Sequence, residues 1–373
     1  MKKIANIVLN EFINDSRVLK TSSSLAALGL SVETVAIHNV GLPETELLDG
    51  LKINRIKLLS RLWPKWKPFQ LIKYFEFLFR AVSCCRNHDV IHCNDLNALP
   101  VGVLVKLFGR DKKVVYDCHE YETETNGLKG LEKISKKWLE KKLIRYSDAV
   151  ITVSDSIANE YLSLYNIPKP HLLLNCPPYR EQPKLNLFRE RLGIRVDQTI
   201  FLYQGGLSKG RGIELLLEAF SDLGSDKNVL VCMGYGTLGD LVRENAQKQN
   251  TVYFHPAVSP DVLLNFTISA DYGVAFIEDA CLSYRYCLPN KIFEYLMAGL
   301  PVLTSNLFEM RRLVEAEAVG VVAKENTVDG FRQAVQASLQ QNYAEMQKNV
   351  FAARKKYCWE EQEKVLEEIY DVL

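Results

Sequence analysis

The sequence lacks the features that would mark a secreted, membrane-spanning or strongly charged protein. No apolar run reaches about 18 residues, and the best candidate, residues 98–108, is interrupted by Lys106, so we expect no membrane-spanning helix. The first apolar stretch is broken by Asn6 and Asn10 and ends at Glu11, which argues against a signal peptide. Neither sign of charge is in large excess, because the chain has 46 Lys and Arg residues and 45 Asp and Glu residues. The net charge of +1 gives no overall attraction to nucleic acid.

Cysteine pairs at metal-binding spacing are also missing. The nine cysteines form an odd set without a CxxC motif, which favours a reducing compartment over a disulfide framework or a structural zinc site. His88 and His92 share one face of a strand-like segment but lie too far apart for a two-residue chelate, so we assign no metal ligands. We expect a cytoplasmic protein, with the inner face of the membrane as a second location.

What the sequence contains is two series of short strands that alternate with helices. With 373 residues, 47% of them apolar, the chain is long enough for two domains with their own cores. The first series of predicted strands covers residues 4–9, 32–37, 90–92, 114–116 and 149–153. The second covers residues 199–204, 229–233, 251–254, 272–276 and 301–304. A helical pattern over residues 16–28 ends at Gly29. This order predicts an α/β fold of two Rossmann-like, doubly wound domains that face a central cleft.

The expected domain boundary lies in residues 175–183, which contain three prolines and several polar residues. We therefore predict one domain over residues 1–175 and a second over residues 185–355. Residues 356–373 carry apolar side chains at helical spacing. We expect them to form a helix that packs back towards the amino-terminal domain.

A glycine-rich turn is the first candidate site. Residues 205–212 (GGLSKGRG) follow a predicted strand and precede a helix that begins near Ile213. The backbone N–H groups of such a turn can bind an anion such as a diphosphate, and Lys209 and Arg211 add two positive charges. Glycine content alone fits an ordinary solvated turn equally well. The spacing matches neither a P-loop nor the GxGxxG dinucleotide motif.

A second candidate segment covers residues 286–302. Pro289 is placed to open a short helix and Gly299 to close it. Glu294 lies midway in this helix among apolar neighbours. Its carboxylate is either a solvated surface group or a clamp on vicinal hydroxyls such as those of a ribose.

Together with other motifs, these two segments resemble a known family. The other motifs are DSRVLK at residues 15–20, DCHE at 117–120, Val153-Ser154, Asn175, and GYG at 234–236. The set resembles the retaining glycosyltransferases of family 4, which have the GT-B architecture of two Rossmann-like domains. The resemblance implies transfer of a sugar from a nucleotide-diphosphate sugar, with UDP or GDP expected, to a glycan or lipid-linked glycan acceptor in polysaccharide biosynthesis. It implies that residues 1–175 form an acceptor-binding domain and residues 185–355 a nucleotide-sugar-binding domain. It also implies that the anomeric configuration is retained and that neither a metal nor another cofactor is needed.

The resemblance also implies roles for individual residues. Arg211 and Lys209 would face the leaving diphosphate, and His119 would lie near the transferred sugar. Glu294 would hold the ribose hydroxyls. The other expected nucleotide-sugar contacts are Gly205, Gly206, Gly234, Tyr235, Val258, Tyr286, Leu288, Asn290 and Lys291. The expected acceptor-side residues are Asn14, Asp15, Arg17 and Glu120.

Two positions depart from the family pattern. Tyr286 stands where the first Glu of the E-x7-E pair is usual, and Gly206 stands where an Arg is usual. The candidates for the missing positive charge are Lys209, Lys291 and Arg285. The departures keep open a sugar-nucleotide-binding protein with weak catalysis. An NAD-dependent oxidoreductase on tandem Rossmann domains is a further alternative, which the missing GxGxxG motif disfavours.

Two amino-terminal segments combine positive charge with aromatic residues. Residues 61–69 interleave the two kinds, and residues 128–147 set seven Lys and Arg residues beside Leu131, Ile134 and Trp138. Such surfaces bind anionic membrane interfaces. A solvated basic helix face with its aromatic residues in the core is an equally good interpretation. We expect no nucleic-acid partner, because the chain has no RNP or OB signature.

Overall fold

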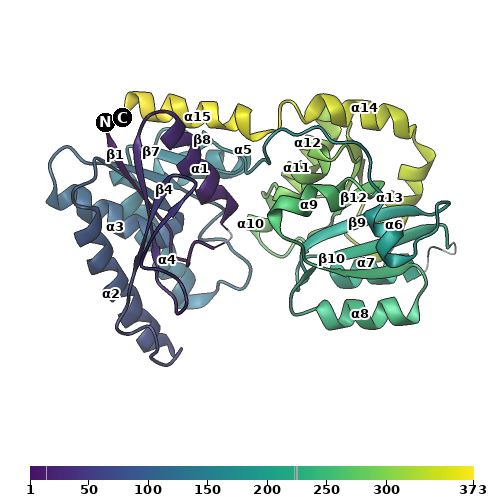
Figure 1. Cartoon of the computed structure of the whole chain (residues 1–373), viewed down its shortest axis with the longest axis horizontal. Helices are drawn as coiled ribbons and strands as arrows, with labels where there is room; N and C mark the ends of the chain where they lie inside the picture. The colour runs from purple at the N-terminus through teal and green to yellow at the C-terminus, as the bar shows by residue number, and fades with distance from the viewer. Residues whose placement is uncertain (14, 222, 224–225) are drawn as a thin grey trace. The chain divides into compact units, whose positions relative to one another are not determined.

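The structure is a computed structural model that describes residues 1–373 except 14, 222, 224 and 225. It contains two compact α/β units (Figure 1). Unit 1 comprises Met1–Leu173 together with Glu363–Leu373, and unit 2 comprises Leu174–Gln362.

Unit 1 is built on an eight-stranded sheet with the order β3-β4-β2-β1-β5-β6-β7-β8. Its strands are β1 (Lys3–Ile7), β2 (Ser31–Ile37), β3 (Thr45–Leu48), β4 (Leu51–Ile56), β5 (Val90–Asn94), β6 (Lys113–Asp117), β7 (Ala149–Thr152) and β8 (His171–Leu172). The pairing is parallel throughout, except that β3 runs antiparallel to β4. All five strands predicted in this half are present, with ends that shift by at most two residues, whereas β3, β4 and β8 were not predicted.

The helices of unit 1 alternate with these strands along the chain. They are α1 (Ser16–Ala27), α2 (Lys67–Cys85), α3 (Asp95–Phe108), α4 (Gly130–Leu143), the short 3₁₀ helix η1 (Ile144–Tyr146) and α5 (Asp155–Tyr165). Asp15 caps α1, because its carboxylate accepts a hydrogen bond from the N–H of Val18. A Cβ at Gly102 of α3 would lie 2.5 Å from the Sγ of Cys93 on β5, so this helix can approach the sheet only with glycine there.

Unit 2 is built on a six-stranded, fully parallel sheet with the order β11-β10-β9-β12-β13-β14. Its strands are β9 (Thr199–Gly206), β10 (Asn228–Tyr235), β11 (Val252–Pro256), β12 (Tyr272–Ala275), β13 (Val302–Thr304) and β14 (Gly320–Val322). The five predicted strands are present, with ends that shift by at most two residues, and β14 was not predicted.

Helices cover both faces of the second sheet. They are α6 (Leu187–Leu192), α7 (Ile213–Ser221), α8 (Gly239–Lys248), α9 (Pro260–Thr267), α10 (Leu282–Arg285), α11 (Asn290–Met297), α12 (Phe308–Glu317), α13 (Val328–Gln340) and α14 (Tyr343–Ala353), whereas α15 (Trp359–Val372) begins in unit 2 and continues into unit 1. Successive residues of β9 enter opposite cores: Phe201 packs in one cluster with Phe331, and Leu202 packs in the other with Leu296. A sheet with a core on each face is the doubly wound arrangement expected from the Val- and Ile-rich strands.

The last helix connects the two units in the chain. α15 begins in unit 2, and its residues from Glu363 onward belong to unit 1. No helix in the described part of the chain is long and apolar enough to cross a membrane. The nine cysteines, all of them at described positions, carry free thiols.

Candidate active site

The glycine-rich turn of unit 2 begins where β9 and β10 end side by side. Gly205 pairs in register with Gly234, and Gly206 pairs with Tyr235. A Cβ at Gly234 would lie 1.9 Å from the carbonyl oxygen of Gly205, so no side chain fits between these backbones. Gly205 has a φ of 116°, a conformation that favours glycine. The glycines therefore allow two strand ends to approach closely and leave backbone, rather than side chains, at this edge of the sheet.

The turn then leads into α7. Gly212, with a φ of 68°, lies against Phe276, where a Cβ would meet the aromatic ring at 2.3 Å. Lys209 is exposed in the turn and Arg211 is half-buried. The guanidinium of Arg211 lies 4.9 Å from the centre of the Tyr284 ring. This cation–π contact holds the positive charge of Arg211 at the turn.

Helix α11 is fixed to the sheet by one tyrosine. The hydroxyl of Tyr295 accepts a hydrogen bond from the N–H of Gln204 at 3.0 Å and donates to the carbonyl oxygen of Val274 at 3.0 Å. Gly273 makes room for the ring, because a Cβ there would lie 2.1 Å from it. With the rotation of α11 fixed in this way, Lys291 and Glu294 lie one turn apart on its partly exposed face.

Lys291 brings a second cation to the turn. Its Nζ lies 3.6 Å from the centre of the Tyr203 ring and 3.7 Å from the position that a Cβ on Gly205 would take. Burial, followed by the positive charge of Arg211, lowers the pKa of Lys291 to about 7. Two positively charged side chains that repel each other in a partly buried site form a strong receptor for an anion, because a bound anion offsets that repulsion.

Glu294 is oriented by a chain of hydrogen bonds. Its carboxylate accepts a hydrogen bond from Nε2 of Gln204, whose side-chain oxygen accepts one from the hydroxyl of Thr267 at 2.8 Å. Gln204 is buried, and its amide donates to Glu294 and accepts from Thr267. The predicted residues Gly205, Gly206, Gly234, Arg211, Lys291 and Glu294 are thus brought together by β9, β10 and α11.

The other residues predicted for the nucleotide sugar lie around this group. Tyr235 is exposed at the end of β10, Asn290 is the exposed first residue of α11, and Leu288 and Val258 are half-buried. The ring of Tyr286 packs edge-on against Phe308, with 6.4 Å between ring centres. Arg285, a candidate for the missing charge, forms an ion pair with Asp279 at 3.0 Å. Lys291 is therefore the better-placed candidate, since it lies beside Arg211.

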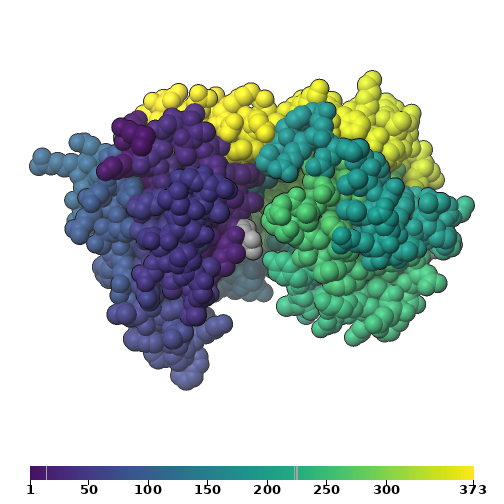
Figure 2. Space-filling model, viewed as in Figure 1, coloured from purple at the N-terminus to yellow at the C-terminus, as the bar shows by residue number. Residues whose placement is uncertain are grey.

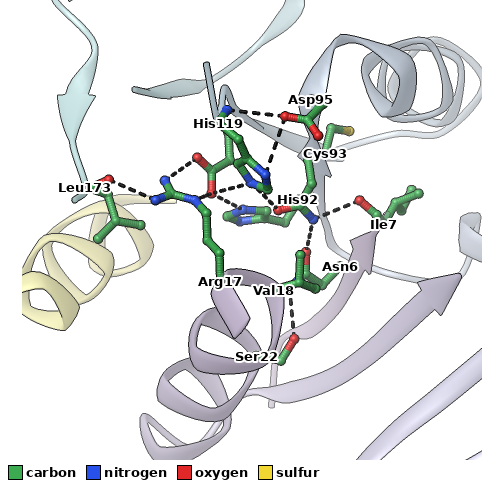
Figure 3. Close-up of polar contacts among 12 residues, drawn as sticks. Asn6, Ile7, Arg17, Val18, Ser22, His92, Cys93, Asp95, His119 and Leu173 are labelled. Atoms are coloured by element: carbon green, nitrogen blue, oxygen red, sulfur yellow. Dashed lines mark hydrogen bonds and ion pairs between the residues drawn. The ribbon is translucent and has the colours of Figure 1, made fainter. Parts of the chain in front are cut away.

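In unit 1, a buried polar cluster surrounds Asp117 at the carboxyl end of β6. Figure 3 shows Arg17, His92 and His119 of this cluster. Arg17 donates to both carboxylate oxygens, from Nε at 3.0 Å and from Nη2 at 2.6 Å. Its Nη1 donates to the carbonyl oxygen of Leu173 at 2.9 Å. Burial raises the pKa of Asp117, but Arg17, followed by His119, outweighs burial and holds that pKa well below its usual range. Asp117 is therefore ionised at neutral pH.

His119 lies between two carboxylates in this cluster. Its Nε2 is 3.6 Å from Asp117 and 3.2 Å from the side-chain oxygen of Asn94, and its Nδ1 is 3.5 Å from Asp95. Burial lowers the pKa of His119, but Asp95 and then Asp117 raise it above its usual value overall. Because both ring nitrogens face acceptors, the imidazolium form suits the site best. Asp95 has a φ of 62°, which is uncommon for a residue other than glycine and aims its side chain at His119.

The predicted acceptor-side residues have varied environments. Arg17 is buried and is held by Asp117, and Asp15 is the cap of α1 that also accepts a hydrogen bond from Asn10. Glu120 is exposed. Asn14 lies outside the described residues. What the structure shows for Arg17 and Asp15 is a structural role, in fixing Asp117 and the start of α1.

Two family models match the chain. One, described as Glycosyltransferase Family 4, matches residues 16–175, and the other, described as Glycosyl transferases group 1, matches residues 198–341. The chain belongs to the family 4 glycosyltransferases. The family, the enzyme class and the two Rossmann-like domains predicted from the sequence are thereby confirmed.

Solved structures show the same fold as this glycosyltransferase. Sucrose-phosphate synthase from Thermosynechococcus elongatus is 18% identical, with a TM-score of 0.79 over 100% of this chain and 98% of that one. HepE of Anabaena, in complex with UDP and glucose, is 16% identical, with a TM-score of 0.77 over 100% of both chains. Among curated proteins, an uncharacterised glycosyltransferase of Methanocaldococcus jannaschii is 26% identical over 317 residues, which are 80% of this chain and 78% of that protein. The structural likenesses show the GT-B fold.

Several polar residues in and beside the cluster around Asp117 were not predicted as site residues from the sequence. His92 contacts Asp117 at 3.4 Å through Nε2 and the hydroxyl of Tyr370 at 2.8 Å through Nδ1. Asn94 donates a hydrogen bond to the side chain of Asn6 at 2.6 Å. The available signal was the polar run that follows the apolar start of β5, because β5 and β6 are neighbours and their carboxyl ends meet at one edge of the sheet. Within the described residues, no group of three His, Cys, Asp or Glu side chains is arranged to hold a metal ion.

Proposed function

We propose that this glycosyltransferase moves a sugar from a UDP- or GDP-sugar to a hydroxyl of a glycan or lipid-linked glycan in polysaccharide biosynthesis. The anomeric configuration is retained and no metal ion is required. The observation that carries the proposal is the meeting of Arg211, Lys291 and Glu294 at the glycine-rich turn of unit 2. The structural relatives support the ligand class, since HepE was solved with UDP-glucose and starch synthase IV of Arabidopsis thaliana with ADP.

The cations stabilise the leaving group. When the bond between the anomeric carbon and the diphosphate breaks, negative charge develops on the phosphate oxygens. Arg211 and Lys291 are already in place and need no rearrangement to meet that charge, and Lys209 lies in the same turn. Three side-chain cations supply the positive charge that a divalent metal would otherwise provide, which is the reason for proposing a metal-independent reaction.

Glu294 recognises the nucleoside. A carboxylate has about four lone-pair positions, so Glu294 can keep its hydrogen bond from Gln204 and still accept from two ribose hydroxyls. Gln204 acts as a positioning residue, because it fixes the carboxylate without touching the ligand.

His119 contributes from unit 1. The family resemblance assigns it to the transferred sugar, and as an imidazolium it adds a positive charge while its two N–H groups face Asp95 and Asp117. The acceptor oxygen then forms its bond to the anomeric carbon on the face that the diphosphate leaves, and the acceptor proton passes to the departing phosphate oxygen. This front-face route retains the configuration and needs no protein nucleophile.

The test begins with a thermal-shift panel of UDP, GDP, dTDP, CMP, ADP and NAD. A ligand at 100 times its Kd should stabilise the protein by about 2.7 kcal/mol. The sugar donors of the best nucleotide are then assayed for transfer with and without EDTA, and the anomeric configuration of the product is determined by NMR. Stabilisation by NAD alone, loss of activity with EDTA, or an inverted product would each contradict the corresponding part of the proposal.

A sugar-nucleotide-binding protein with weak catalysis is the second candidate. The exposed Gly206 and the half-buried Tyr286, which replace an Arg and a Glu of the family pattern, favour it. Tight nucleotide binding without turnover over a panel of donors and acceptors would support this candidate instead. The family models assign the chain to glycosyltransferases rather than to NAD-dependent oxidoreductases.

A further inference from the structure

Helix α4 is amphipathic with its apolar side turned outward. Of its fourteen described residues, Glu140 alone is fully buried. The exposed fractions of Leu131, Ile134 and Trp138 are 85%, 64% and 62%. These three residues recur at intervals of three and four and so form one stripe. Of the two interpretations that the sequence left open, the one that places these residues in the core is wrong.

A buried carboxylate anchors the inner side of α4. The Glu140 side chain accepts hydrogen bonds from the hydroxyls of Tyr116 at 2.6 Å, Tyr161 at 2.8 Å and Tyr165 at 2.5 Å. Three tyrosines from β6 and α5 thus fix the rotation of the helix. Turning the apolar stripe inward would bury it against this polar group and leave three hydroxyls without their acceptor, which is unfavourable.

Two lysines attach the same side of α4 to the rest of unit 1. Lys133 and Lys137, one turn apart, pair with the buried Glu124 at 2.6 Å and 2.5 Å. The contacts that attach α4 to unit 1 through these residues and Glu140 are therefore polar. The outward apolar stripe is thus a consequence of specific ion pairs and hydrogen bonds.

The segment that leads into α2 extends this surface. Lys67, the first residue of α2, lies 3.7 Å from Glu132 in the first turn of α4, so the two helices begin close together. Trp63 and Trp66 are 45% and 73% exposed. Figure 2 shows this end of α2 projecting from the rest of unit 1 at the lower edge of the view. Aromatic side chains are therefore presented beside the stripe of α4.

Positive charge is concentrated in the same two segments. Residues 61–86 contain six Lys and Arg residues and one Glu, and residues 128–147 contain seven Lys and Arg residues and two Glu. The two segments together carry a formal net charge of +10, whereas the whole chain carries +1. Indole rings and aliphatic side chains bordered by lysines match the interfacial region of a bilayer with anionic lipids.

We propose that the outward stripe of α4, together with Trp63 and Trp66, docks unit 1 on an anionic lipid bilayer. Leu131, Ile134 and Trp138 enter the interfacial region, and Lys141 and Lys142 on the exposed side meet the headgroups. The docking stands on these observations alone. Its purpose, which is to reach a lipid-linked acceptor at the membrane surface, rests on the proposed function.

Co-sedimentation of the full-length protein with vesicles tests the docking. The protein should bind vesicles that contain phosphatidylglycerol at low salt, more weakly at high salt, and at least tenfold more weakly when the vesicles are pure phosphatidylcholine. The triple variant Leu131→Ser, Ile134→Ser, Trp138→Ser should lose at least tenfold in partitioning. Its matched control is Leu162→Ser, Leu164→Ser, Val196→Ser, which removes three exposed apolar residues elsewhere and should bind like the wild type. The docking is overturned if the wild type stays in the supernatant with anionic vesicles at low salt, or if both triple variants bind equally.

Fluorescence gives a second readout. Three of the four tryptophans lie on the proposed surface, and the fourth, Trp359, is only 6% exposed. Brominated lipids should therefore quench much of the emission of the vesicle-bound protein, and an unquenched spectrum would overturn the insertion of these rings.

Two other binding partners of this surface would give different experimental results. Binding of single-stranded oligonucleotides that the same triple variant abolishes would assign the surface to nucleic acid, and a concentration-dependent dimer that the variant dissociates would assign it to a second copy of the chain. Each result would overturn the docking proposal.

Nucleotide binding is measured separately by calorimetry and should be equal in the wild type and the triple variant. If the wild type binds vesicles but no nucleoside diphosphate, the proposed function fails and the docking stands.

Discussion

Nucleotide binding should be coupled to the uptake of a proton by Lys291. In the ligand-free protein, burial and the neighbouring Arg211 lower the pKa of this lysine to about 7, compared with an ordinary value of 10.5. A bound diphosphate places negative charge beside the ammonium group and should raise the pKa again. The free lysine is largely neutral above pH 7, so it must take up a proton when the ligand binds.

The size of the effect follows from the two pKa values. At pH 8 the free lysine is only about one-tenth protonated and the bound lysine almost fully protonated, so binding should take up about 0.9 proton. Because the bound pKa lies above the free pKa, the contribution of Lys291 to affinity is complete below pH 7. It should fall about tenfold per pH unit as the pH rises between the free and the bound pKa. The diphosphate has its own ionisation near pH 6, so measurements between pH 7.5 and 9 report mainly the proton that Lys291 takes up.

The assay is calorimetric titration with the nucleoside diphosphate in buffers of different ionisation enthalpy. The slope of the observed enthalpy against the buffer enthalpy gives the number of protons taken up. Lys291→Arg keeps a charge at every pH used and should show no uptake and a flat pH dependence. Lys291→Met should show no uptake and weaker binding at pH 7, whereas Lys209→Met, which removes an exposed lysine of the same turn, should keep the uptake.

Two results would refute this reasoning. One is the absence of net proton uptake by the wild type at pH 8 despite clear binding. The other is an unchanged uptake in Lys291→Met, which would place the titrating group elsewhere.

Three further substitutions have defined outcomes. Arg211→Ala should lower kcat/KM by about 10- to 1,000-fold, because losing one charged contact to the leaving group costs about 1.4–4 kcal/mol, and unchanged kinetics would remove Arg211 from the site. Glu294→Ala should weaken the binding of nucleoside diphosphate in calorimetry but not that of pyrophosphate, which has no ribose; equal losses would contradict the ribose role. Arg17→Met should destabilise unit 1 by about 3–5 kcal/mol in urea denaturation at pH 7, because it leaves the buried Asp117 carboxylate unpaired. The folded pKa of Asp117 lies below its unfolded value, so this stabilisation is present above about pH 4 and is lost as the pH falls towards the folded pKa. A difference between wild type and variant that stays constant on acidification would disprove the ionic role.

Most of the strands that were predicted from the sequence are buried over much of their length. Each of the ten predicted strands is an apolar run and is present in one of the two sheets. The missed strands are short, largely exposed or interrupted by polar residues: β8 has two residues, β14 has three, β3 is largely exposed, and β4 alternates apolar with polar residues at Leu51–Asn54. Such strands need no continuous apolar run, because one side or one edge of them faces solvent. A continuous apolar run is therefore what makes a strand recognisable in the sequence.

The group of residues at the glycine-rich turn could be predicted because its signal is local. A strand, a glycine-rich turn and a helix opened by Pro289 are consecutive patterns, and the family resemblance added roles for Arg211 and Glu294. The proximity of Lys291 to Gly205 is not local, since it depends on how Tyr295 fixes α11 against β9. Its lowered pKa is a consequence of that packing.

The polar cluster around Asp117 and the orientation of α4 were decided by tertiary structure alone. His92 and Tyr370 are 278 residues apart and meet because the last helix returns to unit 1. The sequence of α4 predicts an amphipathic helix but not which side is buried, and Glu140 among three tyrosine hydroxyls decides that. Helix and strand formation depends on residues a few positions apart, so the sequence by itself determines the elements, the two domains and the family. Which side chains meet depends on strand order and helix rotation, and these are set by contacts between residues far apart in the chain.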